Sequence, residues 1–224
     1  MKGLVLKDIY SVRFQLFGGF ALMLLPNIML IISGGDLSGG EGGLNRFLSV
    51  MIYGGMNYIS ITLCSSFLLN TLEFDEKSGW AKMQRAMPLS GGQIIGGKLI
   101  AMAIVLGIMT VSSLVCNLTG VIFFDRPVEP LIALPFIAGF LQTITLSLCF
   151  MAGYRFSSRI TMLTYILTEL VIAAGIIFLI IGMVTEKVSE TAVRAITYAA
   201  IPVLTAAVTV ICFISGKKAV MKDL

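Results

Sequence analysis

The 224-residue chain contains no histidine and few charged residues, and both shortages narrow the range of functions. Without histidine there is no His-ligated zinc or haem, no Ser–His or Cys–His nucleophile and no histidine proton relay. Only 12% of the residues are charged and 57% are apolar, which is far too apolar for a soluble domain of this size. Four cysteines without metal-ligand spacing each lie in an apolar block, so we expect small packing residues at Cys64, Cys116, Cys149 and Cys212.

The apolar residues come in blocks of about 20 or more, the length that crosses a hydrocarbon core of ~30 Å. The pattern predicts an all-α polytopic membrane protein whose single transmembrane domain covers residues 1–224. Six transmembrane helices are expected over 14–33, 47–72, 99–124, 131–153, 160–183 and 195–215, the first with a kink at Pro26.

Residues 1–13 precede the first span and mix apolar with basic side chains. This mixture predicts an interfacial helix that lies on an anionic lipid leaflet. A secretory signal peptide is the alternative, because basic residues precede an apolar run. No small-x-small cleavage pattern follows, and the run is long enough to span the membrane.

The distribution of lysine and arginine predicts the orientation. With the N-terminus inside, 12 of the 16 basic residues fall on the inner side and 4 on the outer side. The positive-inside rule therefore predicts that both termini and the polar stretch 73–98 are cytoplasmic. The net charge of +4 is spread along the membrane edges without clustered aromatic residues, so no nucleic-acid partner is expected.

The stretch 73–98 is the longest polar passage of the chain. After three acidic residues, Ser78 to Met87 is predicted to form one amphipathic helix, with Ser78 as its cap and Pro88 beyond its end. Its apolar face holds Trp80, Met83 and Met87 at positions i, i+3 and i+7, and Lys82 and Arg85 lie off that face. Such a helix either lies on the lipid surface or docks into another protein.

The segment from Gly92 to Leu99 nearly matches a phosphate-binding loop, with Gly97 and Lys98 in the expected places. It has leucine where the loop needs serine or threonine to bind magnesium. A strand should also precede such a loop, whereas an amphipathic helix is expected here. We therefore reject nucleotide binding in this chain and interpret Lys98 as a marker of the inner membrane boundary.

Glu169 is the one formal charge well inside a predicted span, nine residues or ~14 Å from its start. A carboxylate at this depth is costly unless it is neutralised or paired. One interpretation is a polar contact for cationic groups in a substrate path, to which Asn117 and Gln142 from other spans contribute. The alternative is a protonated glutamic acid that is hydrogen-bonded between packed helices.

The polar stretch carries a family resemblance in Asp75-Glu-Lys-Ser-Gly-Trp80, followed by Pro88, Ser90 and Lys98. With the opening M-K-G-L-V-L-K-D, this pattern resembles the type-2 ABC exporter permeases, and in particular the short bacterial branch that includes phenol-soluble-modulin peptide exporters. The six predicted spans agree with that family. Many of its members carry a re-entrant hairpin before the last span, for which 184–194 is too short unless the fifth span is broken near Gly175 or Gly182.

The resemblance implies a transmembrane subunit that pairs with a second copy of itself, and each of the two copies binds one ABC ATPase subunit, so that the complex holds two ATPase copies. ATP and magnesium would be held by that ATPase, so this chain would not itself be an enzyme and would carry no cofactor, metal or catalytic residue. The protein would be located in the bacterial cytoplasmic membrane, and the exported substrate would be an amphipathic or antimicrobial-type peptide. The ATPase-coupling residues implied are Glu76, Gly79, Trp80, Lys82, Met83, Arg85, Met87 and Pro88.

Two other classes remain open at this point. A non-transporting immunity or sensor subunit would bind a cytoplasmic partner through the same loop. A membrane-embedded enzyme such as an intramembrane protease needs a second carboxylate, a histidine or a Ser–Lys pair at membrane depth. Only Glu169 lies there, so the enzyme ranks last.

Overall fold

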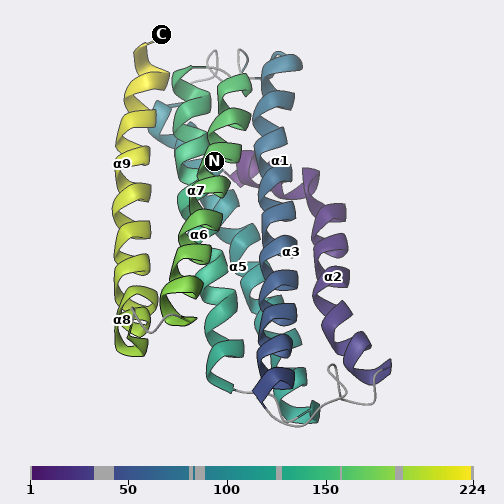
Figure 1. Ribbon diagram of the computed structural model, residues 1–224. Coiled ribbons are helices and arrows are strands. Elements are labelled where there is room, and N and C mark those ends of the chain that lie inside the picture. Colours follow the sequence, from purple (N-terminus) through teal and green to yellow (C-terminus); the bar gives the residue numbers. More distant parts are fainter. Residues whose placement is uncertain are drawn as a thin grey trace. The chain divides into compact units, whose positions relative to one another are not determined.

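The computed structural model describes residues 2–32, 43–80, 83, 89–124, 128–156, 158–184 and 189–222. These residues fold into helices, and no strand occurs among them (Figure 1). The helices are α1 (Lys2–Ser11), α2 (Arg13–Ile32), α3 (Gly43–Lys77), α5 (Gly91–Phe124), α6 (Val128–Arg155), α7 (Ser158–Val184), α8 (Glu190–Ala195), the π-helix η1 (Ile196–Ala200) and α9 (Ile201–Lys222).

Five of the described helices contain a segment long and apolar enough to cross a membrane: Ile52–Lys77, Gly91–Phe123, Leu131–Arg155, Ile160–Phe178 and Ile196–Ala219. Helices α1 and α2 qualify only together, as one span interrupted by a bend at Val12, and that reading makes six. The predicted all-α polytopic membrane fold is therefore confirmed.

The predicted N-terminal helix is present as α1, which a single residue, Val12, separates from α2. Leu6 and Tyr10 lie one turn apart on α1 with more than 60% of their surface exposed, as an apolar face turned toward lipid would be. Its location at the membrane surface stays a prediction.

The predicted loop over 73–98 is wrong at both ends, because helices extend into it. Helix α3 continues through the acidic residues to Lys77, and Ser78 N still donates to Phe74 O at 2.9 Å. Gly79 follows with φ +72°, a conformation that favours glycine and turns the chain out of α3. The next helical hydrogen bond runs from Met83 N to Gly79 O at 3.1 Å, so Gly79 rather than Ser78 begins the following turn.

Helix α5 begins at Gly91, two turns before the predicted start at Leu99. Ser90 and Gln93 form a capping box, in which Gln93 N donates to Ser90 Oγ at 3.2 Å and Ser90 N donates to Gln93 Oε1 at 2.9 Å. The paired isoleucines Ile94 and Ile95 are buried, and Leu89, Leu99, Tyr154 and Phe213 pack against them. This cap and this burial explain why a glycine-rich sequence is helical here.

The last two long helices contain no re-entrant break within their described lengths. Helix α7 runs from Ser158 to Val184 through both candidate break points, Gly175 and Gly182. Helices α8, η1 and α9 follow one another without a gap (Figure 1). The π-turn, in which Ile201 N donates to Ile196 O, directly precedes Pro202, whose ring would crowd the carbonyl four residues back in a regular α-helix.

The chain divides into two compact units. The first comprises residues 1–8, 68–102 and 140–224, and the second comprises residues 9–67 and 103–139. Helices α1, α3, α5 and α6 each contribute a segment to both units. The prediction of a single domain stays a prediction.

The capping box yields a test of the revised start of α5. Ser90→Ala removes the acceptor for the Gln93 amide and should lower the free energy of unfolding by about 1 kcal/mol. Ser90→Asp retains an acceptor and should stay near wild type. Thermal or denaturant unfolding in detergent micelles measures both, and equal stability of the alanine and aspartate variants would contradict the cap.

Candidate functional site

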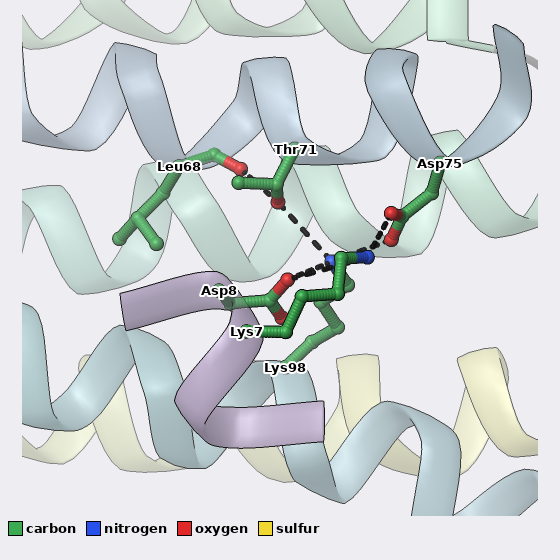
Figure 2. A network of polar contacts seen from close by, with 6 residues as sticks. All are labelled: Lys7, Asp8, Leu68, Thr71, Asp75 and Lys98. Carbon is green, nitrogen blue, oxygen red and sulfur yellow. Dashed lines mark hydrogen bonds and ion pairs between the residues drawn. The ribbon is translucent and has the colours of Figure 1, made fainter. Parts of the chain in front are cut away.

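The candidate site is a buried charge cluster where α1, α3 and α5 meet within the first unit. We define the charge cluster as Lys7, Asp8, Thr71, Asp75 and Lys98. Figure 2 shows the two carboxylates and the threonine hydroxyl converging on the Lys98 ammonium. Asp8, Thr71 and Asp75 are all far from Lys98 in the sequence, so the packing of the helices brings them together.

Lys98 is the centre of the charge cluster. It lies about two turns into α5 and only 4% of it is exposed. Its ammonium donates to Asp8 Oδ1 at 2.8 Å, to Asp75 Oδ2 at 2.9 Å and to Thr71 Oγ1 at 3.1 Å. An ammonium has three N–H donors, so all of them are used. Lys98 is therefore a buried, fully hydrogen-bonded ion, and its place at the inner membrane boundary stays a prediction.

Asp75 links the two lysines of the cluster. Its Oδ2 accepts from Lys98, and its Oδ1 accepts from the Lys7 ammonium. Lys7 also lies 3.9 Å from Asp8 Oδ1. The two lysines and two aspartates sum to zero charge, which makes their burial tolerable, since an unpaired buried ion costs several kcal/mol.

The charge cluster reaches the segment predicted to form the docking helix. The Lys7 ammonium lies 5.0 Å from the centroid of the Trp80 ring, a cation–π contact worth about 0.5–2 kcal/mol. The Trp80 ring is half-buried, and its indole N–H is buried without a hydrogen-bond partner in the part of the chain that the structure describes. Met83, one turn further on, is 53% exposed.

The other predicted coupling residues are placed only in part. Gly79 makes the turn after α3, and Glu76 is exposed on the last turn of α3. Lys82, Arg85, Met87 and Pro88 lie outside the described residues.

Two of the three predicted path residues lie together in the first unit. Gln142 Nε2 on α6 donates to Glu169 Oε1 on α7 at 2.9 Å. Gln142 is fully buried, whereas Glu169 is half-exposed. A side-chain amide that donates to a carboxyl oxygen can hold Glu169 in place in either protonation state.

Asn117, the third predicted path residue, lies in a different cluster in the second unit. Its Nδ2 donates to Leu131 O at 2.7 Å, and its Oδ1 accepts from Asn57 Nδ2 at 3.0 Å. Nearby, Tyr53 donates to Asn27, whose Nδ2 donates to Cys116 O at 2.9 Å. These neutral hydrogen bonds join α2, α3, α5 and α6, which favours a helix-packing role for Asn117.

The four cysteines are free and buried, as expected of packing residues.

The sequence interpretation missed Lys7, Asp8 and Thr71 as members of a site. A signal was available, because Asp8 is the only acidic residue in the basic N-terminal segment and Lys98 follows the apolar pair Ile94 and Ile95. The pairing itself joins residues 90 positions apart and needs the tertiary structure.

These features define a multi-pass helical membrane protein with a charge cluster beside the Trp80 ring. A family model described as ABC-2 family transporter protein matches residues 3–220, nearly the whole chain. The chain therefore belongs to the ABC-2 transporter family, whose members are transmembrane permease subunits that work with an ABC ATPase. Searches of curated proteins and of solved structures gave no match.

The charge cluster yields a stability prediction. Lys98→Met keeps the length of the side chain but leaves two carboxylates buried beside one lysine. The free energy of unfolding should fall by about 3–5 kcal/mol. Unfolding in detergent micelles measures the loss.

Two control variants accompany that measurement. Lys98→Met combined with Asp8→Asn restores the charge balance and should recover part of the stability. Lys77→Gln removes only the exposed pair with Glu73 on α3 and should change stability by less than about 0.5 kcal/mol. A Lys98→Met variant as stable as Lys77→Gln would show that the cluster does not hold the helices together.

Proposed function

We propose that this chain forms the translocation path of an ATP-driven exporter and couples it to a separate ABC ATPase subunit. Family membership supports the permease role. The observation that carries the coupling role is the contact between Trp80 and the charge cluster at the loop between α3 and α5. ATP and magnesium are held by the ATPase in this proposal, and the permease supplies no catalytic group.

The geometry around Trp80 suits a docking segment. Met83 is exposed and the Trp80 ring is partly exposed, so both side chains can contact a partner. Aromatic and methionine side chains are enriched at protein interfaces. Through the Lys7–Trp80 contact, the segment is attached to the charge cluster, which joins three helices. Lys82, Arg85, Met87 and Pro88, which lie outside the described residues, belong to the proposed docking segment by their sequence positions.

The assembly follows from the same proposal. Two copies of the chain pair, and each binds one ATPase, with both termini and the loop between α3 and α5 in the bacterial cytoplasm. The excess of lysine and arginine on the inner side supports this orientation.

We further propose that the substrate is an amphipathic peptide with cationic groups. Glu169 supports this choice, because it is partly exposed and is the only acidic residue on the mostly apolar helix α7. Gln142 Nε2 donates to Oε1 of Glu169, and a carboxylate has further lone pairs that can accept from a substrate ammonium. Asn117 is the weakest path candidate, since both ends of its amide group already have partners.

The first test removes the docking face. Trp80→Ala with Met83→Ala should leave the chain folded but unable to retain the ATPase, because the interface loses its two large apolar side chains. Affinity purification from native membranes, followed by identification of any ABC ATPase by mass spectrometry, measures the effect. Phe123→Ala is the matched control, since Phe123 is a 74% exposed aromatic at the opposite end of α5.

Retention of the ATPase at the wild-type level by the double variant would overturn the docking assignment. If the wild-type chain binds an ATPase but no peptide stimulates ATP hydrolysis, the non-transporting sensor or immunity subunit gains the stronger position.

The second test concerns the substrate. In proteoliposomes containing the whole complex, Glu169→Gln should slow export of a cationic amphipathic peptide about tenfold, because a charge-assisted contact is lost. For a matched peptide with glutamine in place of lysine, the Glu169→Gln complex and the wild-type complex should export at the same rate. Equal export of both peptides by wild type and variant would assign Glu169 to helix packing.

A further inference from the structure

The charge cluster has an inner half and an outer half. The inner half is Lys98 with Asp8, Thr71 and Asp75, where every N–H of the ammonium is used and all four side chains are buried. The outer half is Lys7, whose side chain is 29% exposed and whose ammonium lies between Asp75 and the Trp80 ring. Of the two lysines, only Lys7 contacts the proposed docking segment among the described residues.

The two halves share one carboxylate. Asp75 gives one oxygen to Lys98 and the other to Lys7 (Figure 2). Lys98 therefore fixes the position and orientation of that carboxylate. Asp75 in turn fixes Lys7 at one end of its contact with Trp80. Within the cluster, Lys7 is the residue that contacts the indole ring, so a movement of the ring acts on Lys7 directly. Lys7 belongs to α1 rather than to the segment that holds Trp80.

We propose that Lys7 is a positioning residue that ties Trp80 to α1, so that α1 moves together with the ATPase-contact segment. The inner half of the cluster keeps α1, α3 and α5 together while the outer half adjusts. Only Val12, where the chain bends, separates α1 from α2, so a displacement of α1 acts on the segment that enters the candidate membrane span. This inference rests on the proposed function, because it assigns a role in coupling to the same loop.

The first measurement tests the contact without requiring transport. Trp80 is the only tryptophan in the chain, so fluorotryptophan labelling gives one fluorine signal for the loop. In lipid nanodiscs, Lys7→Gln should shift this signal, because the cation leaves the face of the ring. Lys7→Arg should restore most of the wild-type signal, since a guanidinium also pairs with a carboxylate and stacks on an aromatic ring.

Lys77→Gln is the matched control for the same charge change. Lys77 is close to Trp80 in the sequence, but its side chain is 75% exposed and it pairs with Glu73 on its own helix. Its substitution should leave the fluorine signal in place. A signal that Lys7→Gln moves no more than Lys77→Gln does would overturn the proposal.

The second measurement separates positioning from binding. In the reconstituted complex, Lys7→Gln should bind the ATPase within about threefold of the wild-type Kd. Its ATP hydrolysis stimulated by a synthetic cationic amphipathic peptide should fall about tenfold, with Lys7→Arg and Lys77→Gln near wild type. A merely structural role would instead lower thermal stability and ATPase binding together, and that result would also overturn the proposal.

The failure of the proposed function has a different outcome. If the wild-type chain binds no ATPase, the docking segment and the coupling role of Lys7 both fall, whatever the fluorine signal shows. If the wild-type complex is active and Lys7→Gln is coupled as well as Lys77→Gln, only the positioning role is lost.

Discussion

The burial of the Lys98 ammonium is the constraint on which the packing of α1, α3 and α5 in the first unit depends. A charge removed from water must find partners of opposite sign, and Lys98 finds Asp8 and Asp75 together with the hydroxyl of Thr71. Those partners belong to α1 and α3, so a single side chain of α5 sets the register of three helices. The same requirement fixes the last turn of α3 and therefore the point from which the Trp80 segment leaves.

The two compact units solve the problem of buried polar groups in different ways. The first unit uses ions with a net charge of zero, placed beside the loop between α3 and α5. The second uses neutral amides and a phenol, with Asn57 and Asn117 as one pair and Tyr53 and Asn27 as another. Neutral hydrogen bonds are the less costly means of joining helices in hydrocarbon, where an ion is expensive. Glu169 is the exception, and the cost of placing a carboxyl group there is the reason that we propose a substrate contact for it.

The relation between the cluster and the loop gives the proposed coupling a physical form. A docking segment can transmit movement only if it is attached to something rigid, and the Lys7–Asp75 contact supplies such an attachment. The attachment is graded, because Lys98 is buried and fully bonded whereas Lys7 is partly exposed and lies over an aromatic ring. In the proposed coupling, the buried inner contact keeps the helices together while the partly exposed outer contact lets the Trp80 segment move.

The sequence alone determined the all-α membrane class and most of the helices, because blocks of apolar residues have few ways to satisfy their backbone groups in lipid. It also singled out Trp80, Glu169 and the family resemblance. It misplaced the end of α3 and the start of α5, because glycine and charge usually mark loops, while here Ile94, Ile95 and the ion pairs outweigh those local preferences. Only the tertiary structure decided that Lys98 is buried and that Lys7 reaches Trp80. Contacts between residues some 70 to 90 positions apart depend on how helices pack, and local sequence carries no record of that.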